Sequence, residues 1–376
     1  MIRSPRVLTL IGDMDGCALW RCLNPIAELQ RQGYQGIDWG AKDDDRLAKI
    51  FHTYDAVILP RLHWPAEEQE NAAKWFFTLR MAGLKVIYEL DDDLLSDYFV
   101  HRLVELHGQG ESFASNRRNS IIHTIKKCDG VTVSSQRLAT LLRQYVDIPI
   151  VVIPNYIDIR WFRKVIKAGE RKIPGMTIGW AGGIRPDSDV LEMAEAWARI
   201  AQRFPDVKFV VQGHHASAIY ERVPVNRIVP LDWMPIDYYP MGLINIDIGC
   251  CPLADNPFNR CKTPIKAMEY AVAGAAVVGS PTLYSQIIDD GINGYIARTA
   301  DEWESALAEL VSNYEKRRAM HRALFAKVKK YHSLEANAWR WVQAWTQLIG
   351  EDVLAVHPGI LLPKPNARIM ADYWRN

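Results

Sequence analysis

Two successive blocks, in which short apolar runs alternate with helical patterns, constrain the fold of this chain more than any other sequence feature. In the first block several apolar runs are uninterrupted, as in parallel strands that are covered by helices on both faces. The predicted strands of this block are Val7–Ile11, Gly36–Trp39, Asp55–Pro60, Lys85–Leu90, Gly130–Ser134 and Pro149–Ile153. The predicted helices between them include Pro25–Gln32, Ala66–Met81 and Gln136–Tyr145.

The alternation restarts in the second half of the chain. Its predicted strands are Thr177–Ala181, Lys208–Gln212, Arg227–Pro230, Ile246–Cys250, Ala275–Ser280 and Gly294–Ala297. Its predicted helices are Asp189–Arg203, Pro264–Ala273, Tyr284–Asp289 and Glu302–Asn313. Asp189 and Glu192 have the spacing of a capping box at the start of a helix. Two consecutive blocks of this kind predict an α/β protein of two doubly wound domains.

The 376 residues of the chain are enough for two domains. We place an N-terminal domain at 1–158, a linker rich in Lys and Arg at 159–175, a C-terminal domain at 176–332, and a helix with a tail at 333–376. The linker ends in a Pro-Gly pair, which is typical of turns. The last helix is rich in tryptophan, and we expect it to pack back on the body of the protein.

Composition and charge exclude several classes of protein. Lys and Arg total 45 against 44 Asp and Glu, so the whole chain has no charge excess for binding nucleic acid or a membrane surface. The longest apolar stretch, 271–279, is far shorter than the roughly 20 residues that span a bilayer, so no transmembrane segment is expected. Residues 7–11 predict a first strand rather than a signal peptide. The six cysteines show no zinc-binding spacing, and a reducing cytoplasm fits them best.

The segment 256–280 carries the most informative chemistry. Thr263 is a good N-cap and Pro264 suits the first helical position, so we expect a helix to begin there, with Lys262 at its mouth. Free amides and the dipole at a helix start attract an anion. Glu269 lies near the middle of this helix. The combination suits a nucleoside diphosphate, with Lys262 and the amides on phosphate and Glu269 on sugar hydroxyls; the alternative is an ordinary crossover helix with a surface lysine.

This segment resembles the donor-binding signature of the GT-B glycosyltransferases of family 4, the glycosyl transferases of group 1. In that family a helix carrying a Glu is followed by Ala-x-Gly-x-Pro-Val-Val and a small residue. Other stretches similar to family motifs are Ile287-Ile-Asp-Asp-Gly-Ile-Asn-Gly-Tyr295, Val152-Ile-Pro-Asn-Tyr-Ile-Asp158 and Thr132-Val-Ser-Ser135. The resemblance covers roughly residues 5–330.

The resemblance implies a GT-B fold, in which two Rossmann-like domains face each other across a cleft that holds the active site. It implies a nucleoside-diphosphate sugar donor bound mainly by the C-terminal domain, and transfer to an acceptor hydroxyl with retention of anomeric configuration. It also implies that no metal or other cofactor is needed. Glu269 would contact the nucleotide ribose. Lys262 and the helix amides would stabilise the departing diphosphate while the N-terminal domain positions the acceptor.

Two positions depart from the family pattern. Family members usually carry Glu-x7-Glu, and Cys261 stands where the first Glu would contact the donor sugar; a thiol cannot accept two hydroxyl bonds as a carboxylate does. The family's Gly-Arg-Leu-x-x-x-Lys-Gly phosphate segment is replaced by residues 179–185. Gly182 and Gly183 would let a phosphate approach the backbone closely. Arg185 either substitutes for the family's cation or is a solvent-facing loop residue.

Other candidate residues follow strands of the first domain. Gly12 and Gly16 flank a short loop, which is either a donor-binding turn or a tight strand-to-helix turn. His63 is either catalytic or structural. Three adjacent aspartates end a strand where α/β sheets place ligands. We expect one of them, Asp91 or Asp93, to contact acceptor hydroxyls or act as a base, and another to cap the next helix; the alternative is a metal site.

Two further features belong to the second half. Gly213 and His214 follow a strand, and we expect a contact with the nucleotide base there rather than a metal site, with a simple loop as the alternative. The basic stretch 316–330 predicts a solvated helix face, or else a surface for a polyanionic acceptor or a membrane.

The sequence therefore predicts a glycosyltransferase that takes a sugar from a nucleoside-diphosphate donor. It leaves the acceptor open among a glycan, a lipid-linked sugar, a small molecule and modified DNA. Three alternatives stand beside this prediction: glycosylation of hydroxylated bases in DNA, a sugar-nucleotide epimerase or hydrolase, and a non-catalytic nucleotide-sugar binding module.

Overall fold

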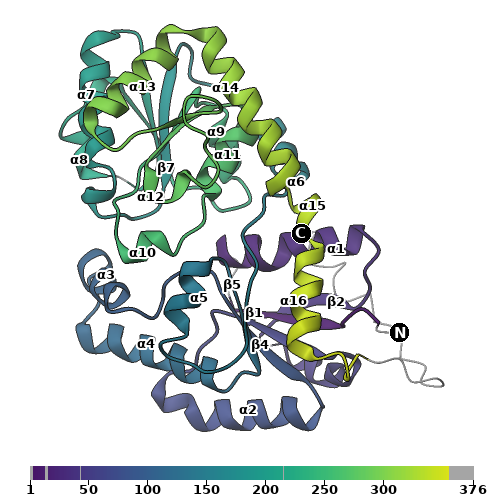
Figure 1. Cartoon of the computed structure of the whole chain (residues 1–376). Helices are drawn as coiled ribbons and strands as arrows, with labels where there is room; N and C mark the ends of the chain where they lie inside the picture. The colour runs from purple at the N-terminus through teal and green to yellow at the C-terminus, as the bar shows by residue number, and fades with distance from the viewer. Residues whose placement is uncertain (1–2, 13–15, 43, 215, 355–376) are drawn as a thin grey trace. The chain divides into compact units, whose positions relative to one another are not determined.

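A computed structural model describes residues 3–12, 16–42, 44–214 and 216–354, which form two compact α/β units (Figure 1). Unit 1 comprises the described residues of Met1–Ser96, Ser112–Pro154 and Ala338–Asn376. Unit 2 comprises those of Asp97–Glu111 and Asn155–Asn337. The chain therefore enters unit 2 twice, first for a short segment and then for most of its second half, and it returns to unit 1 each time.

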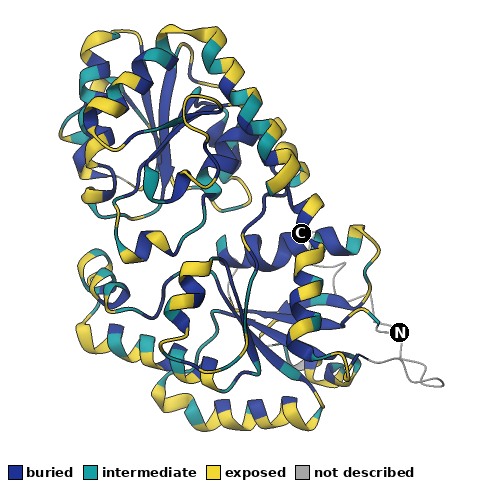
Figure 2. Cartoon of the chain, in the orientation of Figure 1, coloured by how far each residue is buried: buried dark blue, intermediate teal, exposed yellow. Residues whose placement is uncertain are grey.

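Unit 1 is built on a six-stranded sheet in which every strand pair is parallel and the order is β2-β1-β3-β4-β5-β6. All six predicted strands are present, with ends that differ by one or two residues from the predicted ones. Because helices cover both faces, three of the central strands are buried along their whole length, and the fourth, at Lys85–Leu90, is buried at all but its first residue (Figure 2). The strands are β1 (Val7–Ile11), β2 (Ile37–Ala41), β3 (Ala56–Pro60), β4 (Lys85–Leu90), β5 (Gly130–Val133) and β6 (Ile150–Val152).

The helices of unit 1 connect these parallel strands. The α-helices are α1 (Asn24–Arg31), α2 (Gln69–Met81), α4 (Glu111–Lys126), α5 (Gln136–Leu142) and α16 (Trp339–Ile349). A π-helical segment, Ala18–Leu23, precedes α1, and short 3₁₀ turns cover Asp45–Lys49, Phe51–Thr53 and Ala66–Glu68. The helix predicted at Ala66–Met81 is thus a 3₁₀ turn followed by α2.

Unit 2 is built on a second parallel sheet, of order β12-β11-β10-β7-β8-β9. Its six predicted strands are also present. A large apolar cluster, which includes Trp197, Phe209 and Trp303, fills the space between this sheet and its helices. The strands are β7 (Thr177–Gly182), β8 (Lys208–Gly213), β9 (Ile228–Leu231), β10 (Ile248–Cys251), β11 (Ala276–Gly279) and β12 (Tyr295–Ile296).

The helices of unit 2 vary widely in length. The longer ones are α3 (Asp97–His107), α6 (Ile159–Ala168), α7 (Leu191–Arg203), α11 (Ile265–Ala273), α13 (Ala300–Ser312) and α14 (Tyr314–Lys327). The short ones are α8 (Ser217–Tyr220), α9 (Tyr239–Leu243), α10 (Pro257–Arg260), α12 (Pro281–Tyr284) and α15 (Leu334–Asn337), with 3₁₀ turns at Asp187–Asp189 and Val225–Arg227 and a π-helical segment at Val328–His332.

The predicted helix Tyr284–Asp289 is wrong. The helix in this region, α12, begins at Pro281 and ends at Tyr284. The chain then turns, because the Asn293 side chain accepts a hydrogen bond from the Asp289 amide at 2.8 Å and donates one to the Asp289 carboxylate at 2.9 Å. This side-chain bonding offers the backbone an alternative to helical hydrogen bonds.

The predicted capping box at Asp189 and Glu192 is also wrong. Val190 precedes the first residue of α7, and no side chain caps that helix. The Asp189 carboxylate instead accepts hydrogen bonds from the Asn259 side chain at 2.7 Å and the Ala254 amide at 3.2 Å. A local pattern that suits a cap is overridden here by partners more than sixty residues away.

The predicted linker and the predicted C-terminal segment both contain helices. Residues 159–175, predicted as a linker, contain α6, which Asp158 caps by accepting from the Trp161 amide at 2.9 Å. The predicted C-terminal helix is confirmed as α16 and packs on unit 1, where Leu348 lies so close to β5 that a Cβ at Gly130 would be 2.7 Å from its Cδ2. The predicted tail after it lies almost entirely outside the described residues.

Candidate functional site

Two glycine-containing loops meet at the carboxyl edge of the unit 2 sheet. Gly182 ends β7, and Gly213 ends the neighbouring strand β8. Gly213 has φ +100°, and a Cβ there would lie 2.4 Å from the Gly182 carbonyl oxygen, so only glycine fits. The His214 amide donates to that same oxygen at 3.1 Å. The close approach leaves backbone rather than side chains at the edge where α/β sheets bind ligands.

An aromatic platform stands beside these loops. The rings of His214 and Trp233 have their centroids 5.1 Å apart, and Trp233 is 63% exposed. Gly183 faces the same indole, since a Cβ there would lie 3.8 Å from it. Sequence reasoning missed Trp233, although an exposed tryptophan after an edge strand is a signal in itself. The next residue, His215, lies outside the described residues.

Arg185 is turned back toward the β7 loop. Its Nη1 lies 3.4 Å from Oδ2 of Asp189, and the two side chains are 16% and 0% exposed. Its Nε is buried and has no hydrogen-bond partner within the described part of the chain. A Cβ at Gly182 would be 3.3 Å from this Nε. Arg185 therefore lies over the glycine loop and does not face solvent, which was the alternative left open by the sequence.

The start of α11 differs from the prediction. The helix begins at Ile265, one residue later than expected, and Pro264 occupies the N-cap position without a side-chain hydrogen bond. Thr263 is not the N-cap, because its hydroxyl accepts from the Asn155 side chain at 2.8 Å. Lys262 lies just before the helix, with Nζ 4.4 Å from the centroid of the Phe258 ring. Cys261 is buried, with 5% exposure.

Glu269 lies on α11 and is only 2% exposed. Its Oε2 accepts a hydrogen bond from the Tyr239 hydroxyl at 2.7 Å and forms an ion pair with Lys266 Nζ at 3.0 Å. Burial and the Glu269 charge raise the pKa of Tyr239 well above its ordinary value, so the phenol stays protonated and donates. Sequence reasoning missed both partners: Lys266 had a signal in its i,i+3 spacing from Glu269, whereas Tyr239 had none.

The carboxyl edge of the unit 1 sheet holds the other predicted residues. Asp91, after β4, accepts from Arg61 Nε at 2.6 Å, and the two side chains are 12% and 27% exposed. Burial alone would raise the pKa of Asp91, but the charge and hydrogen bond of Arg61 outweigh it, so the pKa is lowered. Arg61 follows β3 and has a backbone φ of +52°, which residues other than glycine rarely adopt. Sequence reasoning missed Arg61.

The remaining unit 1 candidates have different surroundings. Asp93 is 1% exposed and accepts from the amides of Leu95 and Ser96, each at 3.0 Å, so its carboxylate holds the turn that leads into α3. His63 Nδ1 lies 3.3 Å from the Arg61 carbonyl oxygen, and burial lowers the pKa of His63. Gly12 ends the β1 edge and Gly16 opens the following helical segment, while residues 13–15 between them lie outside the described residues.

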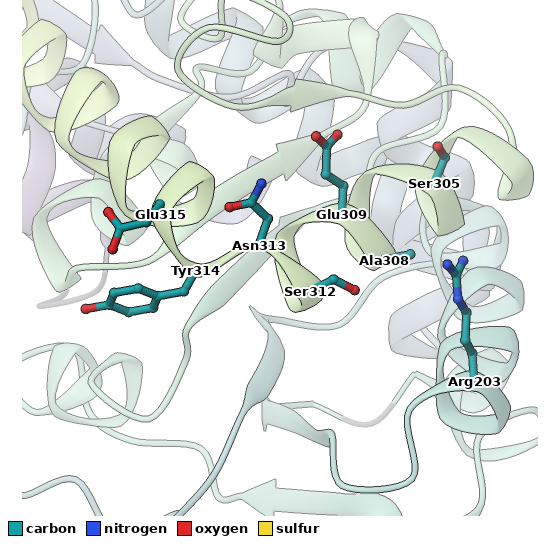
Figure 3. Close-up of a pocket in the computed structure, with 8 residues that line it drawn as sticks. All are labelled: Arg203, Ser305, Ala308, Glu309, Ser312, Asn313, Tyr314 and Glu315. Atoms are coloured by element: carbon teal, nitrogen blue, oxygen red, sulfur yellow. The ribbon is translucent and has the colours of Figure 1, made fainter.

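The open pocket shown in Figure 3 is separate from these edges. Its volume is about 640 Å³. Since α7 ends at Arg203 just before β8 begins, this pocket lies at the amino end of the unit 2 sheet, opposite the glycine loops. The lining residues are Arg203, Ser305, Ala308, Glu309, Ser312, Asn313, Tyr314 and Glu315.

The described residues contain neither a cluster of metal ligands nor a helix that could span a membrane. Within the four described ranges, no three His, Cys, Asp or Glu side chains are grouped so that they could hold a metal ion. In that same part of the chain, no helix is long and apolar enough to cross a membrane.

Comparisons with known proteins agree with this architecture. Residues 175–313 match the family model of the glycosyl transferases group 1. TuaH of Bacillus subtilis (strain 168), named as a proposed teichuronic acid biosynthesis glycosyltransferase, is 24% identical over an alignment of 332 residues. The match covers 78% of this chain and 80% of TuaH.

Two solved structures share the fold. Anabaena HepE in complex with UDP-glucose has a TM-score of 0.62 and 15% identity, covering 91% of this chain and 99% of HepE. A glycosyltransferase from Rickettsia africae has a TM-score of 0.61 and 13% identity, covering 91% of this chain and 98% of that one. The predicted GT-B fold of two doubly wound α/β units is confirmed.

Proposed function

We propose that this chain is a glycosyltransferase in which unit 2 binds a nucleoside-diphosphate sugar and unit 1 presents the acceptor hydroxyl. The match of residues 175–313 to the model of the glycosyl transferases group 1 and the similarity to TuaH support this proposal. The observation that carries the proposal is Glu269. This buried carboxylate has one oxygen held by two donors, and its other oxygen has no partner among the residues described. A ribose hydroxyl would donate to that oxygen.

We assign the diphosphate to the glycine loop, to Arg185 beside that loop and to Lys262 just before α11. Gly182 and Gly183 bring backbone to the carboxyl edge, and the buried Nε of Arg185 lies over Gly182 without a partner in the described structure. Charge-assisted hydrogen bonds from an arginine suit phosphate oxygens. Lys262 stands before the first amides of α11, where a helix start favours an anion. These groups would stabilise the leaving diphosphate.

The base would stack on the aromatic platform of His214 and Trp233. Trp233 is more than half exposed, so its indole is accessible to a stacking base. HepE binds UDP-glucose, as the name of its complex states, so uridine is the first base to test. Cys261 is buried and its thiol is a poor hydroxyl acceptor, so donor-sugar recognition is assigned to other residues.

Unit 1 offers Asp91 to the acceptor. Its lowered pKa keeps Asp91 ionised near neutral pH, so its carboxylate is available to accept a hydrogen bond from the acceptor hydroxyl or to take up the proton of that hydroxyl. Transfer would retain the anomeric configuration and need no metal, because cations on the protein meet the phosphate charge. All six cysteines are buried thiols, which supports a reducing compartment such as the cytoplasm.

A binding screen tests this function. The full chain is titrated calorimetrically with UDP, GDP, ADP and dTDP, and then with the sugar form of whichever nucleotide binds. Glu269→Ala should weaken that nucleotide by about 1.5–3 kcal/mol, as for hydrogen bonds to a charged group. Glu309→Ala is the matched control, since Glu309 lies in the same unit beside the pocket of Figure 3. Equal affinities of the two folded variants would refute the assignment.

Product analysis separates the enzyme classes. Transfer of the sugar to an added acceptor supports a transferase. A product whose anomeric configuration, measured by NMR, is the same as that of the donor supports a retaining one. Loss of donor without any acceptor would indicate an epimerase or hydrolase on the same fold. Tight donor binding with no turnover would indicate a binding module.

A further inference from the structure

Three side chains of unit 2 form a closed triangle of two hydrogen bonds and one ion pair. Tyr239 donates to Glu269 Oε2 at 2.7 Å, Lys266 Nζ donates to the Tyr239 hydroxyl at 2.6 Å, and Lys266 Nζ lies 3.0 Å from Glu269 Oε2. The Lys266 ammonium also lies 4.3 Å from the centroid of the Tyr239 ring. Each member therefore contacts both others, and the triangle fixes a single carboxylate oxygen.

Strand β8 supports the triangle through Gln212. Tyr239 begins α9, and its carbonyl oxygen accepts from Gln212 Nε2 at 2.9 Å. Gln212 lies on β8 and is 1% exposed. A Cβ at Gly242 would lie 2.5 Å from the Gln212 amide, so α9 is pressed against the strand end. Tyr239 has little freedom to leave Glu269 in this packing.

Unit 2 contains a second set of one Tyr, one Glu and one Lys, with which the triangle can be compared. Tyr295 on β12 donates to Glu309 Oε2, and Lys316 on α14 donates to Glu309 Oε1. Both oxygens of Glu309 are therefore occupied. The Lys316 and Glu309 side chains are 35% and 42% exposed, against 22% and 3% for Lys266 and Glu269. Figure 3 shows Glu309 at the open pocket, whose lining residues it joins.

The difference matters energetically. A carboxylate that is 2% exposed is costly unless it is paired and hydrogen-bonded. Lys266 and Tyr239 meet that cost through Oε2 alone. Oε1 has no partner in the described ranges of the chain, whereas in the exposed set both oxygens are used. In the buried set, Oε1 of Glu269 is therefore a charged acceptor that no described residue uses.

We propose that Tyr239 and Lys266 are positioning residues that make the donor site selective for ribose hydroxyls, because they fix Glu269 with Oε1 as a single oriented acceptor. The inference rests on the proposed function, since it names what decides nucleotide selectivity in the proposed donor site. A site built to bond a hydroxyl rejects an analogue that lacks it, because the buried polar group is then left unpaired.

The test compares UDP with 2′-deoxy-UDP and 3′-deoxy-UDP on the full chain by calorimetry; if the screen selects another base, the same three forms of that base are used. The wild-type chain should bind UDP about tenfold or more tightly than at least one deoxy analogue. Tyr239→Phe and Lys266→Gln should lower this ratio severalfold by weakening UDP, while the deoxy analogue changes little. Lys266→Arg should restore part of the ratio.

Tyr295→Phe and Lys316→Gln are the matched controls and should keep the wild-type ratio. Two outcomes would overturn the inference. In the first, the Tyr239 and Lys266 variants bind UDP and the deoxy analogues more weakly by the same factor, which marks a merely structural role. In the second, the wild-type chain binds UDP no more tightly than either deoxy analogue. Binding of none of the four diphosphates would instead contradict the proposed function. If Tyr239→Phe does not fold, the Lys266→Gln and Lys266→Arg pair decides.

Discussion

The guanidinium of Arg21 donates from Nε to Oε1 of Glu89 at 2.9 Å, and the two side chains are 0% and 2% exposed. Arg21 also donates to the Ile153 carbonyl oxygen at 2.6 Å, and Glu89 accepts from the Thr132 hydroxyl at 2.6 Å. Burial raises the pKa of Glu89, while Arg21 and Thr132 act in the opposite direction. This pair crosses from the π-helical segment to the central strand β4.

Breaking the pair from one side should destabilise unit 1 strongly. Arg21→Met is expected to lower the free energy of unfolding by about 3–5 kcal/mol, because Glu89 is left as a buried carboxylate without its cation. Combining Arg21→Met with Glu89→Leu should recover most of the loss. Urea unfolding of the full chain measures both. Arg46→Met, which breaks an exposed pair with Asp44, is the control and should change little. A double variant no more stable than the single one would contradict the reasoning.

Arg61 combines backbone strain with an ion pair, and two substitutions separate them. Arg61→Ala and Arg61→Gly both remove the bond to Asp91, but only glycine adopts φ +52° without strain. The glycine variant should therefore be more stable than the alanine variant by about 1 kcal/mol. Thermal and urea unfolding measure the difference. Alanine equal to or better than glycine would show that the backbone conformation relaxes in the variants.

Asp91→Asn tests the acceptor role. Loss of a general base should lower turnover by about 10²–10⁴-fold, while donor affinity stays unchanged because Asp91 lies in unit 1. Dialysis against EDTA should leave transfer intact if Arg185 and Lys262 meet the phosphate charge. The readouts are initial rates and donor calorimetry on the same samples. Strict dependence on added magnesium or manganese would contradict the proposal, and so would full activity of Asp91→Asn.

Half-buried histidines give a pH dependence of stability. Burial lowers the pKa of His321, whose Nε2 lies 3.1 Å from the Ala271 carbonyl oxygen. The folded-state pKa is thus below the unfolded value of about 6.5. The stability is fully present above that value and is lost as pH falls through the folded-state pKa, because the unfolded chain takes up the proton first.

Unfolding free energies between about pH 7.5 and 5 check this sign. His321→Gln keeps a side-chain donor and removes the titration, so its stability should fall less steeply than that of the wild type over this interval. Parallel curves for the two proteins would mean that His321 titrates alike in both states.

Strand positions could be predicted, since a central strand of a parallel sheet is buried on both faces and reads as an apolar run. Helix starts were less predictable. Thr263 and Asp189 are both good local caps, yet their oxygens accept hydrogen bonds from Asn155 and Asn259, which lie far away along the chain. A capping preference of about 1 kcal/mol is small enough for such tertiary bonds to override.

Local sequence patterns were enough to predict the two α/β blocks, the glycines at the β7 loop and the position of Glu269 on a helix after Pro264. These features depend on residues that are neighbours in the chain, so spacing and composition indicate them. The contact of Tyr239, on a separate short helix, with Glu269 is visible only in the folded chain, and so is the hydrogen bond from Trp341 to the Arg21 carbonyl oxygen across 320 residues. Such partners are brought together by the packing of whole elements, and no local pattern records that packing.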